Sequence, residues 1–157
     1  MQLTRNNYQE SIENAKRLIE LDPNFGIAYD NLGLAYLKTG RHAEALAAFE
    51  KAAQLTDRWG FVLGNLGYAY AATGKRTEAL AIIKELEQKY IRNEAKGFSV
   101  ATVYAGLGDK DKVFEWLEKD FQNRDGSLAE ITASVPLESL RDDPRFKHLL
   151  KRMGLPE

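Results

Sequence analysis

Two histidines are the first side chains to consider as catalytic or metal-binding groups. His42 follows a turn glycine, and His148 has neither a carboxylate nor a second histidine at the spacing of metal ligands on a helix. The chain has no cysteine, which excludes disulfides and thiolate nucleophiles. No serine lies in a nucleophile-elbow pattern, and the turn Gly106–Asp109 lacks the lysine of a phosphate loop. The sequence therefore predicts no catalytic, cofactor-binding or metal-binding residues, and no enzyme.

The charged residues favour solvated surfaces. The acidic pairs Glu85/Glu87, Glu115/Glu118 and Asp142/Asp143 all have basic neighbours, as Glu115 has in Lys119 at helical spacing. A basic set near the C-terminus is diluted by Asp142 and Asp143; it consists of Arg141, Arg145, Lys147, Lys151 and Arg152. With 22 basic against 23 acidic residues in 157, we expect no nucleic-acid partner.

The N-terminus lacks a basic start followed by an apolar core, and apolar residues nowhere form a run of about 18. We therefore expect a cytoplasmic chain that carries no export signal and does not bind a membrane.

A period of 34 residues organises the chain. The segment Leu32–Tyr36 (LGLAY) returns as Leu66–Tyr70 (LGYAY), and Thr39-Gly40 returns as Thr73-Gly74. A third, weaker copy completes two columns at constant spacing, Tyr36/Tyr70/Tyr104 and Gly40/Gly74/Gly108. Self-similarity at this period is typical of stacked structural repeats, which usually present a surface to a partner.

Each period is predicted to hold two helices joined by a glycine turn. In the best unit they cover residues 25–38 and 41–55, and the weakest copy starts with a helix over residues 95–107. The column glycines follow a helix end, where a left-handed backbone suits glycine. We expect Gly33 to face Ala45, and Gly67 to face Ala79, because small residues permit close helix packing.

The Leu-Gly-x-x-Tyr column, the alanine column and the closing Asp22-Pro23 resemble the tetratricopeptide repeat over about residues 8–121. The closing proline is absent from the later copies, where Asp57 and Ile91 stand in its place. The resemblance implies an all-α fold, an α-solenoid of antiparallel helix pairs in a right-handed superhelix. Residues 1–24 then form a half repeat with only its second helix, residues 25–124 form three helix pairs, and residues 125–157 form a cap, all in one domain.

The cap is predicted to contain a loop over 123–126, a short helix over 127–132 and an irregular apolar connection over 135–140. Asp143-Pro144 opens a last helix that ends at Gly154. The run from Leu140 to Phe146 resembles the closing segment of many bacterial tetratricopeptide proteins, in which another module often precedes the repeats. We therefore expect the chain to start within a larger array or to be cut from one.

The resemblance also implies a concave face that holds an extended peptide or a partner helix. Asn31, Asn65 and Ser99 form a column on this face, and an amide side chain offers a donor and an acceptor to a peptide backbone. The alternative is that the asparagines bond within the fold and that Phe98 belongs to the core. The predicted peptide-binding residues are Asn31, Leu34, Lys38, Phe61, Asn65, Tyr68, Phe98 and Ser99.

Two functions remain open. The first is a non-catalytic interaction module that binds a peptide or helix of another protein on the concave face. Relatives that hold acidic chaperone tails use a basic clamp there, which this chain lacks, so we expect apolar or mixed ligands. The second is a self-assembly module that forms a homodimer through the half repeat, where four apolar side chains have lost their covering helix: Ile12, Ala15, Leu18 and Ile19. The partner, the pathway and the oligomeric state do not follow from the sequence.

Overall fold

The fold is built from helices. A computed structural model describes residues 5–123, 128–129 and 131–156 of the chain. Within these ranges the α-helices are α1 (Arg5–Leu21), α2 (Gly26–Lys38), α3 (His42–Leu55), α4 (Gly60–Ala72), α5 (Arg76–Ile91), α6 (Gly97–Leu107), α7 (Lys110–Gln122) and α8 (Pro144–Met153). A short 3-10 helix, η2 (Glu138–Leu140), precedes α8. The predicted all-α solenoid is confirmed, and no strand occurs within the described ranges.

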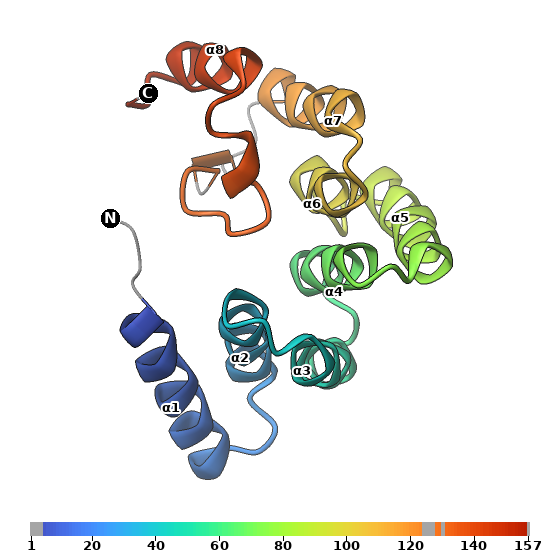
Figure 1. Ribbon diagram of the computed structural model, residues 1–157. Helices are drawn as coiled ribbons and strands as arrows, with labels where there is room; N and C mark the ends of the chain where they lie inside the picture. Colours follow the sequence, from blue (N-terminus) through green and yellow to red (C-terminus); the bar gives the residue numbers. More distant parts are fainter. Residues whose placement is uncertain (1–4, 124–127, 130, 157) are drawn as a thin grey trace.

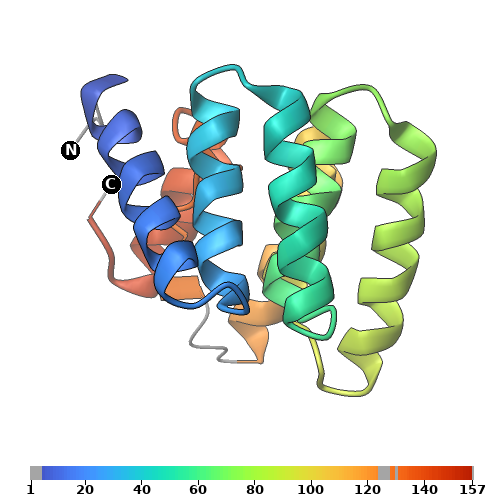
Figure 2. The same ribbon diagram turned by 90° about the horizontal axis from the view of Figure 1, so that it is seen from below.

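Glycine turns connect the helices of each pair. Gly40 lies between α2 and α3, Gly74 between α4 and α5, and Gly108 between α6 and α7. Their φ angles are 76°, 81° and 77°, in the left-handed region where a side chain is disfavoured. The predicted role of this glycine column is confirmed, and Figure 2 shows the successive helices standing side by side.

The helices form a curved array with α1 near one end and α8 near the other (Figure 1). Residues 131–140 do not continue the array. They turn back inside its curve, toward the faces of α2, α4 and α6. The predicted irregular connection over residues 135–140 is thus part of the inner face. The predicted loop over 123–126 falls outside the described residues except for residue 123. Of the predicted short helix over 127–132, residues 128–129 are in 3-10 conformation and residues 131–132 are in a turn.

The predicted pairing of Gly33 with Ala45 and of Gly67 with Ala79 stays a prediction, and larger side chains are the nearest neighbours of both glycines. Ala45 and Ala79 are fully buried, but a side chain at Gly33 would meet the Phe49 ring at 2.7 Å. Phe49 lies one helical turn beyond Ala45, so Gly33 accommodates an aromatic ring. A side chain at Gly67 would meet Val103 of α6 at 2.6 Å and Ile82 of α5 at 2.9 Å, so this glycine lies between its own pair and the next one.

The first helices of neighbouring pairs pack unequally. The contact between α4 and α6 is much more extensive than that between α2 and α4. A side chain at Gly64 would lie 3.0 Å from the carbonyl oxygen of Ser99, so the backbones of α4 and α6 approach closely. Between α2 and α4, by contrast, the Asn65 amide donates to both carboxylate oxygens of Asp30, at 3.1 and 3.0 Å.

Helix α1 packs against α2 and is not an uncovered half repeat. Ile12 and Ala15 are 1% and 3% exposed, so their predicted role in a homodimer is wrong. They bury against the core because α2 supplies the covering helix. Ile19 is partly buried, and Leu18 is 42% exposed.

The last helix begins and ends as predicted. The Asp143 carboxylate accepts a hydrogen bond from the Arg145 N–H at 2.9 Å, and Pro144 occupies the first turn. Gly154 closes the helix with a φ of 72°. Phe146, Leu149 and Leu150 point into the core, which ties α8 to the end of the array.

Candidate functional site

Three hollows on the inner side of the array share one residue, Val135. They lie between the C-terminal segment and helices α1, α2, α4 and α6, with volumes of about 360, 340 and 100 Å³. The inner face predicted to hold a partner is therefore not an open channel. Residues 133–138, called the strap below, divide it into separate cavities.

The largest of the three lies between α1 and α2. Tyr8, Ser11 and Asn14 line it from α1, Asn31 and Leu34 line it from α2, and Val135 forms its far wall. The lining combines hydroxyl and amide groups with apolar side chains and carries no formal charge. This cavity suits a neutral segment with both apolar and hydrogen-bonding groups.

The second cavity, of about 340 Å³, lies at the ends of α2 and α4. Lys38, His42 and Tyr68 line it together with Glu138 of the strap. The Lys38 ammonium donates a hydrogen bond to the Glu138 carboxylate and forms an ion pair with it. This hydrogen bond raises the pKa of Lys38, which keeps the ammonium charged at the mouth of the cavity.

The third cavity is small, about 100 Å³, because the strap fills it. Leu34, Phe61 and Phe98 face residues 133–136 across it. The Phe61 and Phe98 rings are stacked, with centroids 6.5 Å apart and planes 7° from parallel. Trp59, which is 51% exposed, extends the row with its ring 5.6 Å from that of Phe61. A row of aromatic rings therefore leads from the rim to the strap.

The structure brings seven of the eight predicted peptide-binding residues to these cavities. Asn31 and Leu34 line the first, Lys38 and Tyr68 line the second, and Leu34, Phe61, Asn65 and Phe98 line the third. Ser99 lines none of them, because it is only 4% exposed and lies beneath Gly64.

The predicted asparagine column does not form a ladder for a peptide backbone. Asn31 is exposed, but Asn65 is only 5% exposed and its amide is bonded to Asp30. Phe98, at 6% exposed, belongs to the core. The alternative interpretation, in which the amide serves the fold, therefore describes Asn65. Of the two asparagines in this column, Asn31 has the exposed side chain.

Asp30 is a buried carboxylate at the contact between α2 and α4. It is 1% exposed, and burial raises its pKa to about 7, while the hydrogen bond from Asn65 acts in the opposite direction. Near neutral pH this group is thus partly protonated inside the fold. The sequence did not predict this burial.

The strap and the α1 wall are the site residues that sequence reasoning missed. Tyr8, Ser11 and Asn14 were assigned to a half repeat without a role in the groove, and Val135 to a connection. Pro136, in an apolar run without helical period, is the one local sign that this segment lies across other elements. Nothing in the sequence gives its path.

Known proteins agree with this architecture. A family model described as tetratricopeptide repeat matches residues 2–59. The small glutamine-rich tetratricopeptide repeat-containing protein 2 of Mycosarcoma maydis is 41% identical over 44 residues. These residues make up 28% of this chain but only 12% of that relative. This part of the chain is similar to the tetratricopeptide repeat. Such repeats are interaction modules that present extended surfaces to other proteins, and they are not catalytic.

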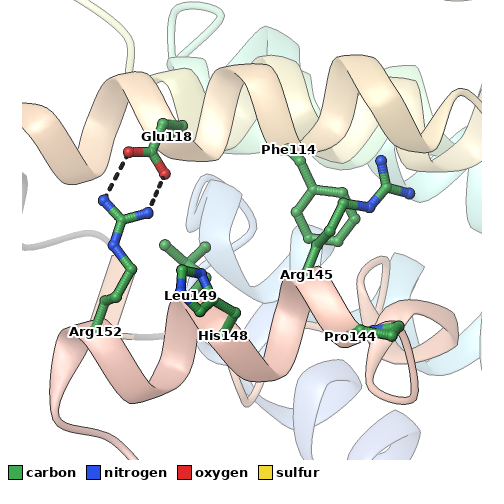
Figure 3. A pocket seen from close by; sticks show the side chains of 7 residues that line it. All are labelled: Phe114, Glu118, Pro144, Arg145, His148, Leu149 and Arg152. Carbon is green, nitrogen blue, oxygen red and sulfur yellow. Dashed lines mark hydrogen bonds and ion pairs between the residues drawn. The ribbon is translucent and has the colours of Figure 1, made fainter.

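Another hollow, of about 440 Å³, lies between α7 and α8 (Figure 3). Its basic side chains are paired with acids. The Arg152 guanidinium donates two hydrogen bonds to Glu118, both 2.8 Å long, and Arg145 pairs with Asp111 and Asp143. The Arg145 guanidinium also lies over the Phe114 ring, 4.4 Å from its centre. These contacts hold α8 against α7, which accords with the predicted solvated surface.

Two further findings concern only the described residues. No group of three or more histidine, cysteine or acidic side chains among them could hold a metal ion. None of the described helices is long and apolar enough to cross a membrane. The expected absence of a nucleic-acid partner stays a prediction.

Proposed function

We propose that this chain binds a short, uncharged segment of a partner protein between α1 and α2. The observation that carries the proposal is the cavity of about 360 Å³, which has neutral walls on both helices. Asn31 offers an exposed amide, Tyr8 and Ser11 offer hydroxyl groups, and Leu34 offers apolar contact. A partner backbone or a short helix that enters this cavity finds apolar and hydrogen-bonding groups together.

The absence of formal charge on this wall sets the expected ligand class. Acidic or basic partner segments gain no complementary charge from the α1 and α2 residues that line the cavity. Binding there should therefore change little with salt concentration. This expectation distinguishes the cavity from the one beside Lys38.

A peptide-display selection on the whole chain tests the proposal. The double variant Asn31→Ala with Leu34→Asp should weaken selected peptides by about 1–3 kcal/mol, because it removes the amide and places a charge in the apolar wall. Lys51→Ala with Gln54→Ala is a matched control, since both residues are exposed on α3 and line none of the three cavities. Peptides that lose affinity equally with both pairs, or with neither, would contradict the assignment.

Self-assembly is the second candidate, and exposed apolar residues near the end of α1 favour it. Leu18, Leu21 and Phe25 are 42%, 84% and 41% exposed. Light scattering should then detect a concentration-dependent homodimer that Leu18→Glu with Leu21→Glu abolishes while helicity is retained. A parent chain that stays monomeric at high concentration would exclude this candidate.

A further inference from the structure

The strap occupies the part of the inner face that lies over α4 and α6. Val135 contributes to all three cavities, and residues 133–136 lie against Leu34, Phe61 and Phe98. Figure 1 shows this segment inside the curve of the array. A stretch of the chain thus takes the place that a partner segment would take on this surface.

Few directional contacts hold the strap in place. Among the described residues, no helix accepts a hydrogen bond from the backbone N–H groups of residues 133–137. The ion pair between Glu138 and Lys38 ties one end to α2, and the Arg141 guanidinium donates to the Thr132 carbonyl at 2.9 Å near the other end. Segments held mainly by side-chain packing open at lower cost than helices do.

Buried residues lie beside and within the strap. Ile131, before the strap, is 1% exposed, and Leu137, inside it, is 0% exposed. Pro136 is also buried, whereas Ser134 and Val135 are half-buried and Ala133 is exposed. Displacement of the strap therefore exposes Pro136 and Leu137 to solvent, while Ile131 can stay in the core.

The strap also shows which chemistry this surface accepts. Val135 and Pro136 meet the wall formed by Leu34 and the stacked Phe61 and Phe98 rings. Three residues after Val135, the Glu138 carboxylate reaches the Lys38 ammonium. The strap segment that covers this surface thus consists of an apolar residue, a proline, one further residue and then an acidic residue.

We propose that the strap is an intramolecular occupant of a partner site, displaced by partner segments that carry the same pattern: an apolar residue, proline, any residue, then Glu or Asp. This proposal rests on the proposed function, because it assumes that the inner face binds a partner segment. It extends that function from the open cavity at α1 and α2 to the covered surface at α4 and α6. The strap competes with the partner at a high local concentration because it is tethered beside its site.

The test uses the full chain and a fluorescent peptide with the sequence of residues 133–139, Ala-Ser-Val-Pro-Leu-Glu-Ser. The strap variant is Val135→Gly with Glu138→Gln, which removes the Val135 side-chain contact and the Glu138 ion pair and leaves Lys38 for the peptide. The matched control is Thr132→Gly with Asp142→Asn. It adds similar backbone freedom and removes one charge, but neither residue lines the three cavities.

We expect the strap variant to bind the peptide at least about tenfold more tightly than the parent and the control do, because the tethered competitor is weakened. A peptide with Lys in place of its Glu should lose this gain, and so should the strap variant with Lys38→Gln. Equal affinity in parent and strap variant, or no binding to either, would overturn the proposal. So would binding that does not depend on Lys38.

Hydrogen exchange on the parent provides a second measurement should the strap variant fail to fold. Excess peptide should speed exchange at the amides of Glu138 and Leu140, whose N–H groups donate to the carbonyls of Val135 and Leu137, since the strap leaves the groove. Unchanged exchange at these amides would overturn the proposal. If peptides selected on the parent bind through Asn31 and Leu34 but are indifferent to the strap variant, and the strap peptide does not bind, the proposed function stands and only this inference fails.

Discussion

Burial of Asp30 predicts an unusual dependence of stability on pH. The carboxyl is 1% exposed between α2 and α4, and burial raises its pKa from 3.8 to about 7 against the opposing hydrogen bond from Asn65. The folded chain therefore holds this proton more tightly than the unfolded chain does. The stability that protonated Asp30 contributes to the folded state is fully present below about pH 4. It is lost as the pH rises through about 7, where the folded chain releases this proton.

The size of the effect follows from the shift in pKa. A difference of about three units, at roughly 1.4 kcal/mol a unit, corresponds to a loss on the order of 4 kcal/mol between about pH 4 and about pH 8. Asp30→Asn should remove this loss, because the amide is nearly isosteric and its oxygen can still accept from Asn65. The variant should match the parent near pH 4 and exceed it at pH 8.

Urea unfolding followed by circular dichroism measures this difference across the pH range. Comparison of variant and parent isolates Asp30 from other carboxylates, such as Glu85, whose pKa is lowered by hydrogen bonding from Arg58 and which acts with the opposite sign. Asp142→Asn is the control, since Asp142 is exposed. Parallel stability curves for the parent and Asp30→Asn would show that the folded state does not retain the proton.

Two further predictions concern the contacts of α6. Gly64→Ala should lower the melting temperature and destabilise the fold by about 1–3 kcal/mol, although alanine favours helices, because the new methyl group lies 3.0 Å from the Ser99 carbonyl oxygen. An unchanged or higher melting temperature would show that α6 can move away. Asp120→Ala should cost about 1–3 kcal/mol in urea unfolding, because its carboxylate accepts from the N–H groups of Gly97 and Phe98 at 2.8 and 2.6 Å. Asp111→Ala, on the exposed side of α7, should cost less than about 1 kcal/mol, and equal costs would contradict the capping role of Asp120.

The helices and their turns followed from local signals. Gly40, Gly74 and Gly108 recur with the period, and each requires a left-handed backbone that the sequence alone suggests. The cap of α8 also followed from neighbours, Asp143 and Pro144. Turns and helix caps can be predicted from sequence because the residues that determine them are adjacent in the chain.

The inner face could be predicted only in part. Leu34, Phe61 and Tyr68 lie on the inner face as the period predicts, because the period fixes which side of a helix faces inward, while their role in binding stays a prediction. The strap was not predicted, since its path depends on contacts such as that of Glu138 with Lys38, 100 residues earlier. The burial of Asn65 depends likewise on Asp30, a partner in another repeat.

The unequal helix contacts explain where the inner face stays open. Between α4 and α6, Gly64 permits close approach of the backbones, and the strap leaves only about 100 Å³ beside Phe61 and Phe98. Between α2 and α4, the hydrogen-bonded pair of Asn65 and Asp30 takes the place of a glycine contact, and the cavities beside α2 are about 340 and 360 Å³.

Asn65 connects these two regions, because its side chain lines the cavity under the strap while its amide donates to Asp30. Ionisation of Asp30 changes the acceptor that this amide meets, so occupancy of the covered surface and protonation of Asp30 should be thermodynamically linked.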